Sequence, residues 1–252
     1  FWGSHLGVID LMLRETEKGW ICENFQVEAR PVCRREEGRA HALVPEDPAI
    51  IEEIQPEHEA TMAWMDESVG WTSLPLTSWF TFLGADPCLA LVNAAQLAFA
   101  RPFLLGTEWE SLPLLSAAAP FLAGAMATDA FVNIPVGELS IRDLMSIYPF
   151  ANTLSMVCCS GAELKEWLER SATVFNHIVP EREAAQPLLN RMPPVYTFDA
   201  IMGDAVSGGL TYTIDIGSPS RYGEQGRLVD SCARRIHDLR LAGGPVEDAQ
   251  KF

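Results

Sequence analysis

The chain has 252 residues, of which 48% are hydrophobic, and it carries a formal net charge of −16. This acidic balance excludes a nucleic-acid polymer as the expected partner, because proteins that bind the phosphate backbone present a basic face. No run of eighteen apolar residues occurs, so the sequence predicts no membrane-spanning segment and no membrane partner.

The beginning of the chain predicts a β-hairpin. Residues 6–13 and 20–29 flank the turn residues Glu17, Lys18 and Gly19. Apolar and polar residues alternate through the second of these segments, which is typical of a half-buried strand.

A charged segment and a helix are expected next. Residues 34–47 are rich in charge and end in proline-bearing turn chemistry, so we interpret them as a solvated linker. Residues 49–68 carry an apolar stripe at helical spacing. Pro56 lies inside this segment and is expected to kink the helix or split it in two, because proline removes a backbone N–H and clashes with the preceding turn.

Residues 86–100 predict a second helix. Asp86 is a favoured N-cap residue, and Pro87 suits the first helical position. The residues predicted to face inward are Leu89, Val92 and Phe99.

Several later segments predict strands and loops. The continuous apolar run LPLLSAAAPF at residues 112–121 favours a buried strand. Residues 180–194 are polar and contain prolines, as loops do. Residues 210–216 alternate between apolar and polar side chains, which indicates a strand, and residues 234–246 indicate a strand and a turn through Gly243 and Gly244.

Residues 137–175 predict a helix, an aromatic loop, a strand and a second helix. Ser140 with Asp143 resembles a capping box, and Pro149 ends the helix that begins there. Residues 153–159 are apolar and β-favouring, so we expect a buried strand. A second capping box, Ser160 with Glu163, opens the next helix. Its apolar face is predicted to consist of Leu164, Trp167, Leu168, Ser171, Ala172 and Phe175.

The loop between the first of these helices and the strand contains Tyr148, Phe150 and Asn152. Aromatic faces beside an amide can stack a flat base and hydrogen-bond its edge or a sugar hydroxyl. The alternative is that the two rings are ordinary core aromatics and the amide belongs to a turn.

Cysteines and histidines form no motif that indicates a metal site. The six cysteines lack a C-x-x-C pair, and we interpret them as buried apolar residues, with a catalytic thiol at Cys158 or Cys159 as the alternative. The five histidines are isolated, and none lies four residues from another. We therefore expect no metal ligand in this chain.

Several long motifs resemble one known family. They are GELSIRDL, YPFANTL and GAELKEWLE within residues 137–169, SHLGVIDL at 4–11, LPLLSAAAPF at 112–121, and YTFDAI with LTYTIDIGSPSRY within 196–222. Together they are similar to the C-terminal domain of the 5′-nucleotidase family. Within that family they most resemble the bacterial 2′,3′-cyclic-nucleotide 2′-phosphodiesterase/3′-nucleotidase branch.

The resemblance implies an α+β fold, a layered α/β/β/α sandwich of the 5′-nucleotidase C-terminal domain type. Residues 70–252 would form this nucleotide-binding domain without its last segment, which carries a second base-stacking aromatic in family members. Residues 1–33 would be a strand hairpin at the tail of a metallophosphoesterase domain. Residues 34–69 would be the linker and bridging helix, a hinge candidate because family members rotate the two domains.

The resemblance also implies a function. The parent protein would be a metal-dependent phosphohydrolase of 2′,3′-cyclic nucleotides and 3′-nucleotides, periplasmic or secreted. A divalent metal pair bound by the N-terminal metallophosphoesterase domain would do the chemistry. This fragment would contain no catalytic residue and would be inactive alone. The alternatives are a 5′-nucleotidase or UDP-sugar hydrolase-type specificity, or a diverged non-catalytic nucleotide-binding or scaffold domain.

Carried over residue by residue, the resemblance assigns base stacking to Phe150 and a polar ligand contact to Asn152, with Tyr148 beside them. The implied partners are a nucleotide or nucleoside and the chain's own N-terminal metallophosphoesterase domain. Asn93 and Gln96 are additional substrate-side candidates, and the alternative for both is a solvated polar residue on a helix.

One loop departs from the family pattern. Relatives in the cyclic phosphodiesterase branch carry a lysine and an arginine in a glycine-rich loop after the strand at 112–121, but residues 122–130, LAGAMATDA, contain no basic residue. Loss of charge-assisted hydrogen bonds would weaken phosphate or ribose binding. Either substrate choice differs, or the metal pair supplies all the attraction for phosphate.

Overall fold

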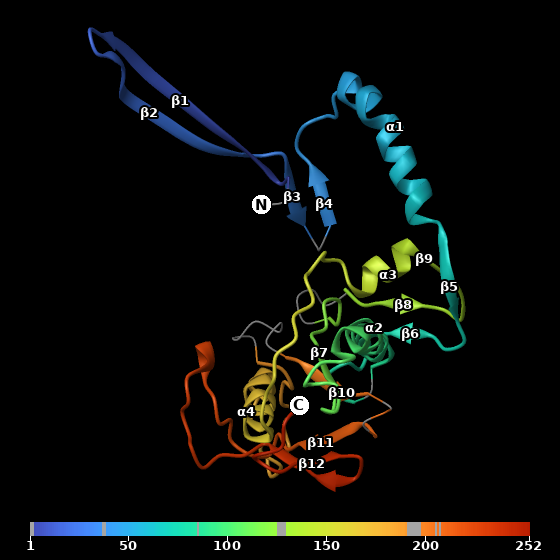
Figure 1. Cartoon of the computed structure of the whole chain (residues 1–252). Helices are drawn as coiled ribbons and strands as arrows, with labels where there is room; N and C mark the ends of the chain where they lie inside the picture. The colour runs from blue at the N-terminus through green and yellow to red at the C-terminus, as the bar shows by residue number, and fades with distance from the viewer. Residues whose placement is uncertain are drawn as a thin grey trace. The chain divides into compact units, whose positions relative to one another are not determined.

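A computed structural model of the chain describes residues 3–36, 39–84, 86–124, 130–190, 198–204, 206 and 208–252. The chain divides into two compact units, Phe1–Ala63 and Trp64–Phe252. Figure 1 shows the elements of both units, and each unit is described here by itself.

The first unit is built from antiparallel hairpins and a helix. Its elements are, in chain order, β1 (His5–Thr16), β2 (Gly19–Pro31), β3 (Cys33–Glu36), β4 (Arg39–Ala42) and α1 (Pro48–Met65), which extends across the unit boundary.

The β1–β2 hairpin confirms the predicted pairing around Glu17, Lys18 and Gly19. The expected half-burial of the second strand is wrong, because β2 is exposed along its whole length. Among the described residues of the first unit, no element covers either face of this two-stranded ribbon. Large side chains such as Ile9 and Phe25 therefore remain open to solvent.

The segment interpreted as a linker contains a second short hairpin, in which β3 pairs with β4. The helix predicted over 49–68 is confirmed as α1, and it is continuous across Pro56 rather than split. One proline removes a single helical hydrogen bond, and the helix continues on either side of it. Asp47 starts the helix by accepting the Ala49 N–H at 2.9 Å.

The second unit mixes strands and helices, which confirms the predicted α+β class. Its elements are, in chain order, β5 (Ser68–Thr72), β6 (Leu76–Thr77), α2 (Pro87–Leu104), β7 (Leu115–Ala118), β8 (Asn133–Ile134), β9 (Gly137–Ser140), α3 (Ile141–Ile147), α4 (Gly161–Ser171), η1 (Ala172–Val174), β10 (Ala200–Gly203), β11 (Leu210–Ile214), η3 (Glu224–Gly226), β12 (Ile236–Leu241) and β13 (Gly244–Pro245). The strand pairs among the described residues are antiparallel: β5 with β9, β6 with β8, β7 with β10, β11 with β12, and β12 with β13.

Both predicted capping boxes are present. At α3, the Ser140 hydroxyl accepts from the Asp143 N–H while the Asp143 carboxylate accepts from the Ser140 N–H. Ser160 and Glu163 make the same reciprocal bonds at α4. These bonds satisfy helix N–H groups that have no intrahelical partner, and they fix where each helix begins.

Helix α2 confirms the predicted Asp86 N-cap, whose carboxylate accepts the Leu89 N–H at 2.9 Å. The prediction of an inward-facing side chain is correct for Leu89 but wrong for Phe99, which is exposed and packs against Phe103 of the same helix. By length and composition this helix could also cross a membrane, which is weak evidence, since a core helix has the same properties. In this unit α2 packs on β7 and β10.

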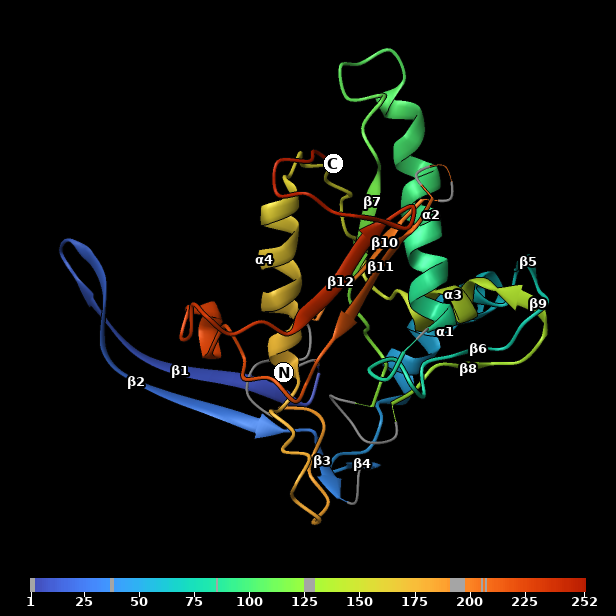
Figure 2. The same ribbon diagram turned by 90° about the horizontal axis from the view of Figure 1, so that it is seen from below.

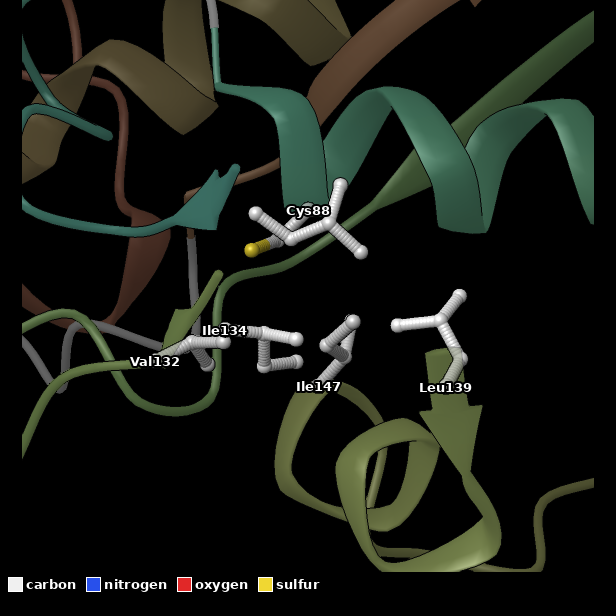
Figure 3. Close-up of a cluster of buried hydrophobic side chains, with 6 residues drawn as sticks. Cys88, Val132, Ile134, Leu139 and Ile147 are labelled. Atoms are coloured by element: carbon white, nitrogen blue, oxygen red, sulfur yellow. The ribbon is translucent and has the colours of Figure 1, made fainter. Parts of the chain in front are cut away.

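Buried side chains form three clusters. The first joins α2 and α3 to β6, β8 and β9 (Figure 3), and it consists of Leu76, Cys88, Val132, Ile134, Leu139 and Ile147. The second lies between α4 and β7, β10, β11 and β12, and its buried members are Leu164, Leu168, Ile201, Leu239, Val246 and Phe252. The third consists of Val174, Phe175 and Phe198. Helices α2 and α4 lie on opposite sides of β7 and β10 (Figures 1 and 2).

The buried strand predicted over 153–159 is not formed. Residues 151–158 are exposed and make no ladder among the described residues, although Cys159 pairs with Phe252. β-favouring residues form a strand only where a second strand supplies hydrogen-bonding partners, and none lies beside 153–158 in the described chain. The strands predicted around 112–121, 210–216 and 234–246 do have partners, and they are confirmed as β7, β11 and β12 with β13.

A buried polar network fixes α4 to β12. The Glu169 carboxylate accepts the backbone N–H groups of Arg235 and Ile236 at 2.9 Å. The Arg235 guanidinium donates to the carbonyls of Ala172 and Phe175 at 2.9 and 2.8 Å. Glu169 and Arg235 are 2% and 1% exposed, so water cannot replace either partner. Burial lowers the pKa of Arg235, and the negative charge of Glu169 opposes that shift.

Replacing Glu169 by alanine should lower the free energy of unfolding by about 3–5 kcal/mol, because it leaves two buried N–H groups unpaired beside a buried guanidinium. Urea titration followed by tryptophan fluorescence measures this loss. Lys165→Ala is the matched control on the same helix, since its bond to Asp248 is solvent-exposed and screened. Equal losses in the two variants would contradict the role given to the network.

Candidate functional site

The aromatic loop that follows α3 is held by a ring that the sequence did not single out. Tyr148 caps α3, and its N–H donates to the Leu144 carbonyl at 2.9 Å. Phe121, shortly after β7, packs edge-to-face against Tyr148 and Phe150, with ring centroids 4.9 and 5.1 Å apart. Each such contact contributes about 0.5–1.5 kcal/mol beyond burial. Phe121 therefore fixes both loop aromatics against β7.

Phe150 is 50% exposed, so one part of its ring packs on Phe121 while the rest faces solvent. Phe150 is therefore not a core aromatic, and the alternative that both loop aromatics are core residues is wrong for this residue. An exposed aromatic face anchored from behind can stack against a flat ligand without being reorganised.

Asn152 is oriented by the neighbouring tyrosine. Its side-chain NH₂ donates to the Tyr148 hydroxyl at 2.9 Å. This bond turns the amide and leaves its carbonyl oxygen as an acceptor for a ligand N–H or O–H.

Tyr148 and Asn152 line a cavity of about 730 Å³ between the aromatic loop and α2. That volume is within the range of small-molecule sites, about 300–1,000 Å³. The other residues around it are Leu91, Val92, Ala95, Gln96, Phe99, Leu144, Ile147, Thr153 and Leu154. No charged side chain of the described chain lines this cavity, so its chemistry suits an uncharged heterocycle better than a phosphate.

The additional candidates on α2 have different environments. Gln96 lines the cavity, and its carbonyl accepts the Ser116 hydroxyl at 2.7 Å, which links α2 to β7. Asn93 is only 1% exposed, and its NH₂ donates to the Ala200 carbonyl at 3.3 Å. The alternative of a solvated helix residue is therefore wrong for Asn93, which joins α2 to β10. Its side-chain oxygen has no partner among the described residues.

The loop that lacks basic residues is anchored at both ends. Its tip, residues 125–129, lies outside the described residues. On the near side Ser78 donates to the Leu122 carbonyl, and on the far side the same hydroxyl accepts the Val132 N–H at 2.8 Å. The first two residues of the YTFDAI motif, 196 and 197, also lie outside the described residues, which resume at Phe198.

A second cavity of about 510 Å³ lies on the outer face of α4. Asp199 and Trp167 belong to its lining, and the indole N–H donates to the Asp199 carboxylate at 2.9 Å. Burial raises the pKa of Asp199, and the indole bond opposes that rise. On the same surface Glu166 accepts a bond from Arg221 at 2.8 Å, which lowers the pKa of Glu166.

The described residues contain no group of three or more His, Cys, Asp or Glu side chains that could hold a metal ion. Two of the thiols, those of Cys88 and Cys159, are poorly suited to nucleophilic chemistry. Burial and the nearby Asp86 raise the pKa of Cys88 to about 12, and burial and Glu163 raise that of Cys159. A raised pKa keeps a thiol protonated and unreactive, which argues against a catalytic thiol at Cys159.

The second unit is thus an α+β domain of a ligand-binding type. Its anchored aromatic loop lies beside an uncharged cavity. The sequence profile of the family described as "5′-nucleotidase, C-terminal domain" matches residues 87–252. The chain belongs to this family, as the sequence motifs predicted.

The sequence similarity to curated relatives extends over the whole chain. The 2′,3′-cyclic-nucleotide 2′-phosphodiesterase/3′-nucleotidases of Yersinia enterocolitica and Salmonella typhimurium are each 34% identical to it over 255 residues, which is 100% of this chain and 38% of each relative. The trifunctional nucleotide phosphoesterase protein YfkN of Bacillus subtilis is 33% identical over 252 residues, 16% of its length. The chain therefore spans well under half the length of these relatives.

A solved structure supports the fold. A Staphylococcus aureus protein assigned as a 5′-nucleotidase, crystallised in complex with alpha-ketoglutarate, superposes with a TM-score of 0.58 at 21% identity. The match covers 95% of this chain and 38% of the other. The predicted 5′-nucleotidase C-terminal domain fold is confirmed.

The raised pKa of Asp199 predicts a pH dependence of stability. The folded state retains this proton at pH values where the unfolded chain, with an ordinary value of 3.8, has lost it. Stability from this group is therefore greatest below 3.8 and is lost as the pH rises through the folded-state pKa. Carboxyl-carbon NMR should show a pKa above 3.8.

Trp167→Phe removes the indole bond that favours the carboxylate, so the pKa of Asp199 should rise further in this variant. Asp199→Asn keeps an acceptor for the indole and should abolish this part of the pH dependence. A wild-type pKa at or below 3.8 would show that burial does not dominate at this carboxyl.

Proposed function

We propose that this chain is the nucleoside-recognition part of a metal-dependent phosphohydrolase that acts on 2′,3′-cyclic nucleotides and 3′-nucleotides. One observation carries the proposal: the half-exposed Phe150 ring belongs to the same loop as the oriented Tyr148–Asn152 pair, and that pair lines an uncharged cavity, although Phe150 itself is not among the residues that line it. The sequence similarity to 2′,3′-cyclic-nucleotide 2′-phosphodiesterase/3′-nucleotidases supports this choice of substrate class.

The geometry suits recognition of a base. A purine or pyrimidine would stack on the open face of Phe150, and its edge or the ribose hydroxyls would donate to the Asn152 carbonyl oxygen. Tyr148 would hold the amide in place for that bond. Because the ring and the amide are positioned before a ligand arrives, little side-chain freedom is lost on binding.

The phosphate chemistry belongs elsewhere in this proposal. The described residues do not provide a metal-binding group, so no hydrolytic step is assigned to them. We propose that a divalent metal pair is held by an N-terminal metallophosphoesterase domain of the parent protein, in the periplasm or outside the cell. Metal ions of this kind activate water and stabilise charge on phosphorus. The present chain would contribute by positioning the nucleoside, so that binding energy at the base serves the reaction.

A second candidate is a diverged, non-catalytic nucleotide-binding or scaffold domain. The absence of lysine and arginine from residues 122–130 favours it, because a loop without cations attracts phosphate less strongly. A 5′-nucleotidase or UDP-sugar hydrolase-type specificity is the corresponding alternative within the enzyme class. Turnover assays with the full-length protein and divalent metal separate these possibilities.

Phe150→Ala should weaken adenosine binding by about 1–3 kcal/mol, or roughly 5- to 150-fold in Kd, because a base loses its stacking surface. Isothermal titration calorimetry measures the change. Phe80→Ala removes another exposed ring, 69% against 50% for Phe150, that lies outside the aromatic loop, and it should leave the affinity unchanged. The same small loss in both variants would remove Phe150 from the site.

In the full-length protein, hydrolysis of 3′-AMP and of 2′,3′-cyclic AMP should stop when EDTA removes the metals and should return when divalent metal is restored. The present chain alone should hydrolyse neither compound. Turnover by this chain, or turnover of the whole protein that persists in chelator, would contradict the proposed division of labour. Failure of the metal-loaded full-length protein to hydrolyse any nucleotide would favour the scaffold alternative.

A further inference from the structure

The cavity of about 510 Å³ on the outer face of α4 differs in chemistry from the cavity beside the aromatic loop. The two share no lining residue. One wall of the α4 cavity is the helix itself, from Glu163 to Ser171, and the other wall is formed by Asp199 and Tyr222. Unlike the cavity at the aromatic loop, it is lined by charges of both signs and by two aromatic rings. We call it the α4 cavity.

Asp199 is a half-buried carboxylate that is fixed against α4. The Ser171 hydroxyl accepts the Asp199 N–H at 2.7 Å and donates to the Asp199 carbonyl at 3.1 Å. The Trp167 indole N–H donates to Oδ2 of the carboxylate at 2.9 Å. Within the described ranges, no arginine, lysine or histidine forms an ion pair with Asp199. A half-buried charge without a counter-charge is stabilised when a cation binds beside it.

Arg170 lines the same cavity as an unpaired cation. Its guanidinium makes no hydrogen bond or ion pair with any residue that the structure describes. The guanidinium lies against Gly226, in the loop between β11 and β12 that passes beside α4 (Figure 2), and a Cβ at Gly226 would lie 2.4 Å from the Arg170 Cζ. Gly226 has a φ of 68°, so glycine permits both this backbone and the close approach of the guanidinium.

Two unlike charges therefore face one cavity without pairing with each other. Unlike charges attract, so a salt bridge would form if both side chains were free to move. Trp167 and Ser171 fix Asp199 on one wall. Gly226 supports Arg170 on the other side of the cavity. A fixed anion and a fixed cation that remain apart are complementary to a ligand that carries both signs of charge.

The α4 cavity also offers an apolar surface. Trp167 is 38% exposed and lies three residues before Arg170, on the same face of the helix. Its indole N–H is bound to Asp199, so the orientation of the ring is set before a ligand arrives. The Tyr222 hydroxyl donates to Glu166, which positions the second ring. Fixed aromatic faces of this kind pack well against another aromatic ring.

The two other carboxylates of the cavity already have structural partners. Glu163 accepts the Ser160 N–H and hydroxyl at 2.7 and 2.6 Å, and Glu166 accepts from Arg221 at 2.8 Å. These bonds lower the pKa of both carboxyls, so both remain ionised. Their charges attract an ammonium group and oppose a ligand that carries a carboxylate alone.

We propose that the α4 cavity binds a free α-amino acid with an aromatic side chain. The ammonium group would donate to the open Oδ1 of Asp199, and the carboxylate would accept from Arg170. The aromatic side chain would pack on Trp167. An amino acid satisfies both unpaired charges, whereas a simple amine leaves Arg170 without a partner and a simple carboxylate leaves Asp199 without one.

The test is an NMR titration of the full chain, followed at the indole N–H of Trp167, with three ligands of the same shape. L-Phenylalanine carries both charged groups, phenethylamine lacks the carboxylate, and 3-phenylpropionate lacks the ammonium group. L-Phenylalanine should bind at least about tenfold more tightly than either analogue. Equal affinities for the three ligands, or no binding of L-phenylalanine, would overturn the proposal.

Two variants test the assignment of each charged group. Asp199→Asn keeps an acceptor for the indole and should abolish the preference for L-phenylalanine over 3-phenylpropionate, while the preference over phenethylamine remains. Arg170→Gln should have the converse effect. Lys165→Gln is the matched control, because it removes an exposed positive charge from α4 outside the cavity and should leave all three affinities unchanged. Equal weakening of all three ligands in both variants would contradict the assignment, since it would indicate a disturbed fold.

Adenosine binding separates this proposal from the proposed function. The α4 cavity and the cavity at the aromatic loop share no lining residue, so Asp199→Asn and Arg170→Gln should leave adenosine affinity unchanged. Binding of L-phenylalanine by a chain that does not bind adenosine would support the α4 cavity and count against the nucleoside site. Loss of adenosine affinity in both variants would overturn the independence of the α4 cavity.

Discussion

The C-terminal unit depends on one buried network, in which Glu169 of α4 accepts the N–H groups at the start of β12 and Arg235 binds the carbonyls of Ala172 and Phe175, which follow α4. Backbone groups at a helix end and a strand start would otherwise be buried without partners. The network satisfies them and sets the position of α4 along β12. Leu164 and Leu168 are thereby aligned with the strands they cover.

The geometry of the candidate site is likewise set by hydrogen bonds and packing that fix helices and strands in place. A capping box at Ser140 determines where α3 begins and so where Tyr148 emerges from its end. Phe121, which follows β7 in the chain, packs edge-to-face against the rings of Tyr148 and Phe150. The exposed ring of Phe150 is thus held by packing between two elements that are distant in sequence.

Local signals predicted much of this structure. Capping residues located the starts of α2, α3 and α4, and alternation located β11, because these patterns depend on neighbours in sequence. The segment 153–159 shows the limit of that reasoning: its composition favours a strand, but a strand needs a partner. The outward side of Phe99, the burial of Asn93, the Glu169–Arg235 network and the part played by Phe121 were also missed, since each depends on contacts between distant parts of the chain. Tyr148, Asn152 and Gln96 could be named beforehand because their motifs resemble a family, and the structure gathers these three around one cavity.

Ser78 holds both limbs of the loop around residues 125–129 with one hydroxyl, through Leu122 on one side and Val132 on the other. This anchorage uses one serine hydroxyl and the backbone groups of Leu122 and Val132, so it requires no charged side chain at either of these two flanking positions. Charge can therefore differ along the described flanks while these two hydrogen bonds stay the same. This is a physical route by which related domains can diverge in the ligands they favour while the scaffold around them stays the same.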